Sequence, residues 1–95
     1  MRILVADDNE ENVKAFMRML KNRNYDVTYS SNGKEALKKL NSKKYDLIIS
    51  DILMPVMDGF QLCRECKKDI KLRNICFIFC TETFTDDIDE EFALS

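Results

Sequence analysis

The stretch of residues 46–59, DLIISDILMPVMDG, constrains the fold of this chain more than any other part of the sequence. Residues 47–49 form a continuous apolar run, which is typical of a strand buried on both faces of a parallel sheet. The run ends at Asp51, and Pro55, the only proline, follows where a loop must have begun, because proline cannot donate to a sheet ladder. Open α/β sheets place their ligand sites at such carboxyl ends of strands. The stretch therefore predicts a buried strand with a functional acid at its end.

Similar apolar runs recur three more times, and segments with helical apolar spacing separate them. Strands that alternate with helices through short connections form right-handed crossovers, so the sequence predicts an α/β fold with a doubly wound parallel sheet. The expected strands are residues 2–6, 27–30, 47–49 and 75–80. The expected helices begin near Asn9, after Asn32, at Phe60 and at Asp86, and the third ends near Asp69.

Helical spacing also predicts which side chains pack on the sheet. The first helix is expected to bury Val13, Phe16, Met17 and Leu20, and the third Leu62, Cys63 and Cys66. The four cysteines lie in this third helix and in the fourth strand, where a thiol behaves as a small apolar group. We therefore expect reduced, mostly buried thiols rather than a zinc site or a disulfide.

Composition and net charge reduce the number of possible protein classes. The 95 residues allow one domain, with 45% hydrophobic and 34% charged residues, an ordinary globular balance. The net charge of -2 gives no footprint for nucleic-acid binding. No apolar run approaches the ~20 residues of a membrane span, so a cytoplasmic protein without membrane contact is expected.

Four polar side chains follow the ends of predicted strands: Asp7 and Asp8 after the first, Asp51 after the third and Thr81 after the fourth. Each alone can be a helix cap or a turn residue. Parallel strands, however, bring all four to one edge, where two carboxylates ~5 Å apart repel by about 3 kcal/mol at an effective dielectric of ~20. Because the sequence has no histidine, a cation held there by oxygen ligands is expected to be Mg²⁺.

Such a site favours phosphoryl chemistry. A bound Mg²⁺ holds phosphoryl oxygens against a carboxylate, and the carboxylate can attack phosphorus to form an aspartyl phosphate. The Thr81 hydroxyl could then form a hydrogen bond with the transferred group.

These motifs resemble the receiver domains of two-component response regulators, with chemotaxis regulators among them. ILVADDNE resembles the family's acidic pair after strand one, and DLIISDILMPVMDG resembles its phospho-acceptor strand and loop. The resemblance implies a flavodoxin-like (βα)5 fold with strand order 2-1-3-4-5. It implies phosphorylation of Asp51, with Asp8 and Asp51 binding Mg²⁺ directly, Asp7 mainly through water and Leu53 through its backbone carbonyl. Thr81 would be the switch hydroxyl, and a sensor histidine kinase or a histidine phosphotransfer protein would be the donor.

One feature departs from the family pattern. The family's lysine, its aromatic switch residue, and the fifth strand and helix would all fall beyond Ser95. We therefore expect residues 1–95 to be a receiver domain that is incomplete at its C-terminus and part of a longer chain. Its apolar fourth strand would then form an open edge, which favours self-association such as a homodimer.

Three functions remain open from the sequence. The first is a signalling switch that catalyses only its own phosphoryl transfer and autodephosphorylation. The second is a receiver-shaped interaction module that is never phosphorylated. The third is a phosphohydrolase with an aspartate nucleophile, which the adjacent Asp7 and Asp8 disfavour because such enzymes usually carry an Asp-x-Asp pair.

Overall fold

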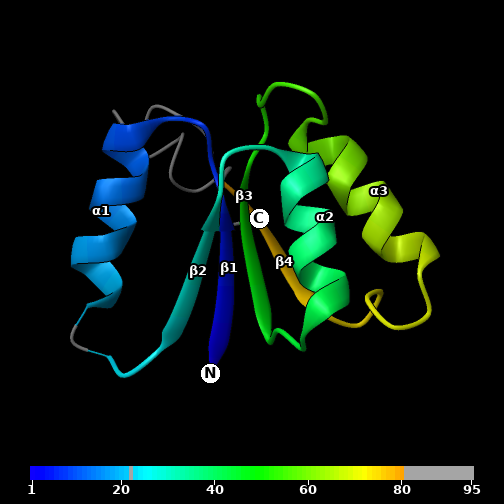
Figure 1. Ribbon diagram of the computed structural model, residues 1–95, viewed down its shortest axis with the longest axis horizontal. Helices are drawn as coiled ribbons and strands as arrows, with labels where there is room; N and C mark the ends of the chain where they lie inside the picture. Colours follow the sequence, from blue (N-terminus) through cyan, green and yellow to red (C-terminus); the bar gives the residue numbers. More distant parts are fainter. Residues whose placement is uncertain (22, 81–95) are drawn as a thin grey trace.

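Four parallel strands form one sheet in the order β2-β1-β3-β4 (Figure 1). The computed structural model describes residues 1–21 and 23–80. The strands are β1 (Arg2–Ala6), β2 (Asp26–Ser30), β3 (Leu47–Asp51) and β4 (Cys76–Cys80). The helices are α1 (Glu10–Leu20), α2 (Gly33–Ser42) and α3 (Gly59–Lys68). This is the predicted doubly wound α/β fold, with each helix crossing between parallel strands.

The two faces of the sheet are covered differently. Helices α2 and α3 lie on one face and α1 lies on the other (Figure 1). The main core lies under α2 and α3, where Leu4, Ile48 and Leu62 are fully buried. On α1 no residue is buried, although Ile3 and Val5 of β1 are.

Each helix begins at a side-chain cap. The Oδ1 atom of Asn9 accepts hydrogen bonds from the backbone N–H groups of Glu11 and Asn12. The equivalent atoms of Asn32 and Asp58 accept from the third residue beyond each cap. These caps satisfy N–H groups that have no partner within a helix, so they fix where each helix leaves the carboxyl edge of the sheet.

Several expectations needed correction. The first helix was expected to bury four side chains but buries none of them: Val13, Phe16 and Leu20 are half-buried and Met17 is 52% exposed. Cys63 is only half-buried and Cys76 is exposed, although all four thiols are free as predicted. The strand and helix ends differ from prediction by one or two residues. Thr81 and the predicted helix at residues 86–93 lie outside the described residues.

Among the helices of the described residues, none combines the length and the apolar character needed to cross a bilayer.

Candidate functional site

Asp7 and Asp8 stand at the carboxyl end of β1. The backbone N–H of Asp7 donates to the carbonyl of Ser30 at 2.9 Å, which continues the β1–β2 ladder by one residue. The Oδ1 atom of Asp7 accepts a hydrogen bond from the N–H of Asn9 at 2.9 Å. This local turn ends the strand and leads directly into the cap of α1, so both acids are held at the sheet edge.

Asp51 is the last residue of β3, beside β1 in the sheet. Its Oδ1 accepts from the N–H of Ile52 at 2.8 Å, and the following loop closes where the N–H of Gly59 donates to the carbonyl of Ile52 at 2.8 Å. A Cβ atom on Gly59 would lie 2.1 Å from the carbonyl oxygen of Asp51. Only glycine fits at this position, because α3 begins directly against the backbone of the acid.

The loop between β3 and α3 is also fixed to α2. The N–H of Gly33 donates to the carbonyl of Met57 at 3.0 Å, and a Cβ on Gly33 would lie 2.5 Å from that oxygen. Within the loop, Val56 has a φ of 70°, a left-handed conformation that is strained for a β-branched residue. Leu53, in the same loop, is 70% exposed.

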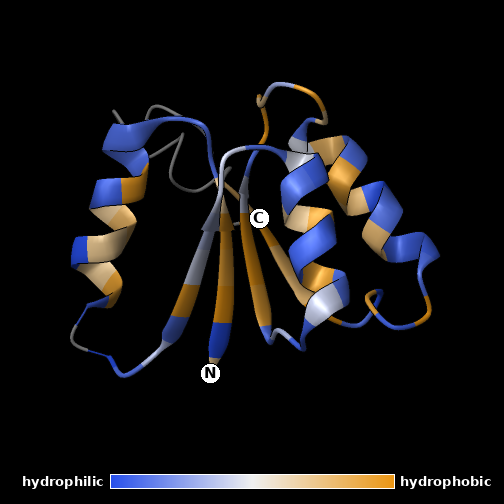
Figure 2. Ribbon diagram, in the orientation of Figure 1, coloured by the Kyte–Doolittle hydropathy of each residue, from blue (hydrophilic) through white to orange (hydrophobic). Residues whose placement is uncertain are grey.

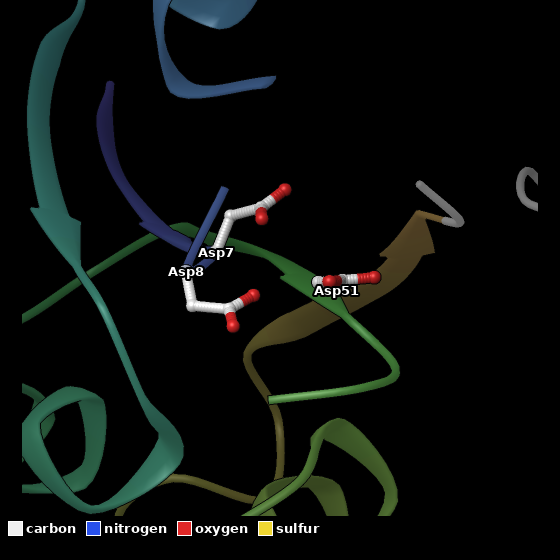
Figure 3. Close-up of side chains that lie close together, drawn as sticks. All are labelled: Asp7, Asp8 and Asp51. Carbon is white, nitrogen blue, oxygen red and sulfur yellow. The ribbon is translucent and has the colours of Figure 1, made fainter. Parts of the chain in front are cut away.

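The carboxylates of Asp7, Asp8 and Asp51 converge. One oxygen from each lies within 4.8 Å of the others, and Figure 3 shows the Asp8 carboxylate directed toward Asp51. Asp7 and Asp51 are only 4% and 2% exposed, whereas Asp8 is exposed. For the buried pair, mutual repulsion is about 3 kcal/mol at an effective dielectric of ~20. A cluster of this kind stabilises a cation at the sheet edge.

The negative charge of the acids affects the ionisation of the Cys80 thiol. It pairs with Asp51 in the β3–β4 register and is 7% exposed. Burial, followed by the carboxylates of Asp7 and Asp51, raises the pKa of the Cys80 thiol to about 11. The thiol of this register partner of Asp51 therefore stays protonated near neutral pH.

The three acids fit a Mg²⁺ ion. All the donor atoms are hard carboxylate oxygens, which Mg²⁺ prefers, and no histidine exists to favour a softer metal. With Mg–O distances of ~2.1 Å, two ligands of one ion lie at most about 4.2 Å apart. A separation of up to 4.8 Å is closed by a small rotation of exposed Asp8 or by one bridging water.

A cavity adjoins Asp7 and Asp8. It has a volume of about 930 Å³ and extends from these acids between α1 and the start of α2. Its wall includes Ser30, whose buried hydroxyl has no hydrogen-bond partner among residues 1–21 and 23–80. The cavity is therefore lined by Asp7 and by exposed Asp8.

The structure brings together three of the predicted site residues, Asp7, Asp8 and Asp51. Thr81 lies outside the described residues, so its position relative to the acids is not described. Sequence reasoning missed Gly59 and Cys80 as neighbours of Asp51. The signal for Cys80 was its place at the end of an apolar strand. Gly59 was interpreted only as part of a turn.

Comparison with known proteins agrees with this geometry. The sequence matches the family model of the response regulator receiver domain over residues 3–94. The alkaline phosphatase synthesis transcriptional regulatory protein PhoP of Bacillus subtilis (strain 168) is 40% identical over 67 residues, which cover 70% of this chain and 28% of that protein. The sensor protein EvgS of Escherichia coli (strain K12) is 41% identical over 68 residues, which cover 72% of this chain and 6% of that protein.

A solved structure is similar over most of the chain. It is the receiver domain of a sensor histidine kinase from Pseudomonas aeruginosa PAO1, with a magnesium ion coordinated in its active site cleft. The TM-score is 0.81 at 29% identity, covering 94% of this chain and 73% of that chain. The chain spans less than a third of the length of either relative named above.

Proposed function

The chain belongs to the response regulator receiver domain family of two-component signal transduction, and from that premise we propose that Asp51 accepts a phosphoryl group. A receiver domain is a signalling module rather than a metabolic enzyme. The observation that carries the proposal is the convergence of buried Asp51 with Asp7 and Asp8 at the carboxyl edge of the sheet. The single-domain assignment of residues 1–95 and the cytoplasmic location expected from the sequence belong to the same proposal.

The reaction is a transfer from nitrogen to oxygen. A carboxylate oxygen of Asp51 attacks phosphorus, the P–N bond of a phosphohistidine breaks, and its electron pair stays on the donor's imidazole nitrogen, which takes up a proton. The backbone N–H of Ile52 holds Oδ1 of Asp51 at 2.8 Å, which orients the carboxylate. Burial at 2% exposure restricts water around the acceptor.

The acids would hold Mg²⁺ during this step. Asp8 and Asp51 would bind it directly, Asp7 through water and Leu53 through its carbonyl. A bound Mg²⁺ neutralises charge on the phosphoryl oxygens. The ion in the Pseudomonas relative, together with the all-oxygen donor set of this chain, supports this assignment.

The donor would be a sensor histidine kinase or a histidine phosphotransfer protein. Support comes from the relatives, which include a sensor protein and the receiver domain of a histidine kinase. Thr81, outside the described residues, would form the switch hydrogen bond with the phosphoryl group.

The test is phosphorylation by a small donor. The chain is treated with acetyl phosphate and Mg²⁺, and its intact mass is measured. Wild type is expected to gain one phosphoryl group that hydroxylamine removes, as an acyl phosphate requires, and Asp51→Asn to gain none. Asp46→Asn, which changes an exposed acid at the opposite end of the sheet, is the matched control and should be labelled like wild type.

Other outcomes point to other functions. A folded wild type that is never labelled would favour a receiver-shaped interaction module. Label that persists on Asp51→Asn would move the acceptor to another residue. Rapid turnover of many donor molecules would favour a phosphohydrolase.

A further inference from the structure

A second concave surface lies between α1 and β2, at the outer edge of the sheet (Figure 1). It is a groove of about 530 Å³. On its helix side lie Lys14, Met17, Arg18 and Lys21, which share one face of α1 because they follow the helical spacing i, i+3, i+4 and i+7. Met17 is 52% exposed there, so the groove presents a large apolar side chain to solvent between three cations.

The floor of the groove is one face of β2 and the residue before it. Tyr25, Val27 and Tyr29 alternate along the chain, so their side chains share a face. β2 is the outermost of the described strands on this side, and Figure 2 shows one hydrophobic band in the first half of this strand. Burial raises the pKa of the Tyr29 phenol, which keeps that wall uncharged. The floor is thus apolar and aromatic, a surface suited to side chains rather than to water.

The groove brings three cations together beside apolar side chains. Within residues 1–21 and 23–80, ion pairs join Arg2 to Asp26 and Lys68 to Glu65, and none involves Lys14, Arg18 or Lys21. Lys34 and Lys38 on α2 are exposed as well, and neither is among the residues that line the α1–β2 groove. A groove on α3 of about 440 Å³ also sets cations beside Phe60 and Phe79, but there Lys68 pairs with Glu65 and Lys67 donates to the carbonyl of Arg73. The α1–β2 groove is distinguished by three cations that form no ion pair within the described residues.

We propose that the α1–β2 groove docks an acidic segment of a partner protein, one that also carries large apolar side chains. The three cations supply charge complementarity, and Met17, Val27 and the tyrosines receive the apolar groups. This goes beyond phosphate acceptance, because the groove is lined by none of the three acids.

The electrostatics also give the segment an orientation. Lys14, Met17 and Tyr29 line both the groove and the cavity beside Asp7 and Asp8. Like charge at that end repels acidic side chains, so the segment's acids are directed toward Lys21. A nucleic acid is disfavoured because the chain's net charge is -2 and only three cations meet here.

The probe is a short fluorescein-labelled peptide that alternates glutamate with phenylalanine and leucine. Its anisotropy is followed on titration with the chain, without Mg²⁺ or phosphodonor, so that the result does not depend on the proposed phosphorylation. Matched peptides carry lysine in place of glutamate, or glutamate without apolar residues. Binding of the first peptide alone, weakened at ~1 M salt where the Debye length is ~3 Å, is the expected result.

Substitutions on α1 and α2 show which surface binds the peptide. Lys14→Glu/Arg18→Glu should weaken the peptide's affinity by about tenfold or more, since two attractive charges become repulsive. Lys34→Glu/Lys38→Glu, with the same charge change and spacing on α2, should bind like wild type. Met17→Gln, which alters only an exposed side chain, should also weaken binding with an unchanged thermal melt.

Three results would overturn the proposal. They are no saturable binding to the acidic apolar peptide, equal loss in the α1 and α2 double variants, and tighter binding of a labelled single-stranded oligonucleotide than of the peptide.

Discussion

Aspartate residues lie at both ends of the sheet, in opposite electrostatic surroundings. At the amino end, Asp26 and Asp46 lie around Arg2: the Nε of Arg2 is 3.2 Å from Oδ2 of Asp26, and its backbone N–H donates to Oδ2 of Asp46 at 2.7 Å. The Arg2 guanidinium also donates to the carbonyl of Lys44 at 3.0 Å. At the carboxyl end, three acids gather within 4.8 Å of one another.

The difference separates structural acids from functional ones. At the amino end, Asp26 pairs with the Arg2 guanidinium and Asp46 accepts from the Arg2 backbone N–H, so these acids join β1 to β2 and to the turn before β3. Acids at the carboxyl end gather like charge, which costs stability and favours binding of an external cation. The first arrangement serves the fold, and the second serves the proposed phosphoryl transfer at the expense of the fold.

The largest effect is expected from Gly59→Ala at the carboxyl end. In an open helix position, replacing glycine with alanine stabilises by ~0.5–1 kcal/mol. Here the new Cβ would meet the Asp51 carbonyl at 2.1 Å, so the variant should lose about 3 kcal/mol of unfolding free energy. Urea denaturation measures this loss of unfolding free energy. Gln61→Ala changes an exposed residue in the same turn of the helix and is the near-neutral control. A stabilised Gly59→Ala would mean that α3 does not begin against Asp51.

The contribution of Cys80 to the free energy of unfolding is expected to change at alkaline pH. The pKa of its thiol is raised to about 11, so the folded state keeps a proton that the unfolded state releases near pH 9. Stability should therefore fall as pH rises from 9 to about 11, and Cys80 should account for about 2 kcal/mol of that fall. Cys80→Ala should show a shallower decline, whereas Cys76→Ala, at the exposed amino end of the same strand, should follow wild type. Identical slopes in all three proteins would contradict a pKa of Cys80 raised by burial and by the neighbouring carboxylates.

Arg2→Ala breaks the amino-end arrangement. It removes the ion pair to Asp26 and the bond to the Lys44 carbonyl, both partly solvated, so a loss of about 1 kcal/mol is expected. Lys68→Ala removes the more exposed pair with Glu65 and should change little. Thermal melts of both variants measure the loss. An equal loss of stability in Arg2→Ala and Lys68→Ala would show that Arg2 does not hold the strands together.

Asp8→Asn acts in the opposite direction. Removing one of three clustered charges should raise stability by about 0.5 kcal/mol in low salt without Mg²⁺, because Asp8 is exposed and its repulsion is screened. High salt should abolish the gain. A destabilised Asp8→Asn under these conditions would contradict like-charge repulsion at this end of the sheet.

Much of this arrangement was predictable from the sequence. Buried parallel strands leave continuous apolar runs, and the acid after each run marks its carboxyl end, so the position of Asp51 and of the Asp7–Asp8 pair followed from pattern alone. The Asn9 and Asn32 caps were likewise readable from local chemistry.

What escaped prediction depends on packing between distant segments. Helical spacing predicts that Met17 shares a face with Val13 but not how deeply α1 sits on the sheet, and Met17 proves half exposed. Arg2 meets residues 24 and 44 positions away, a pairing that no local pattern encodes. The contact between Gly59 and the Asp51 carbonyl arises only when α3 is placed on β3.

Mg²⁺-dependent stability tests the central claim most directly. A ligand of the folded state adds RT ln(1 + [L]/Kd), about 2.7 kcal/mol at 100 times Kd. Thermal melts with increasing Mg²⁺ should therefore raise the midpoint of wild type and of Arg2→Ala equally, and should leave Asp51→Asn and Asp8→Asn nearly unchanged. A wild-type midpoint that does not respond to Mg²⁺, or responses of equal size in all four proteins, would contradict a metal site at the carboxyl end of the sheet.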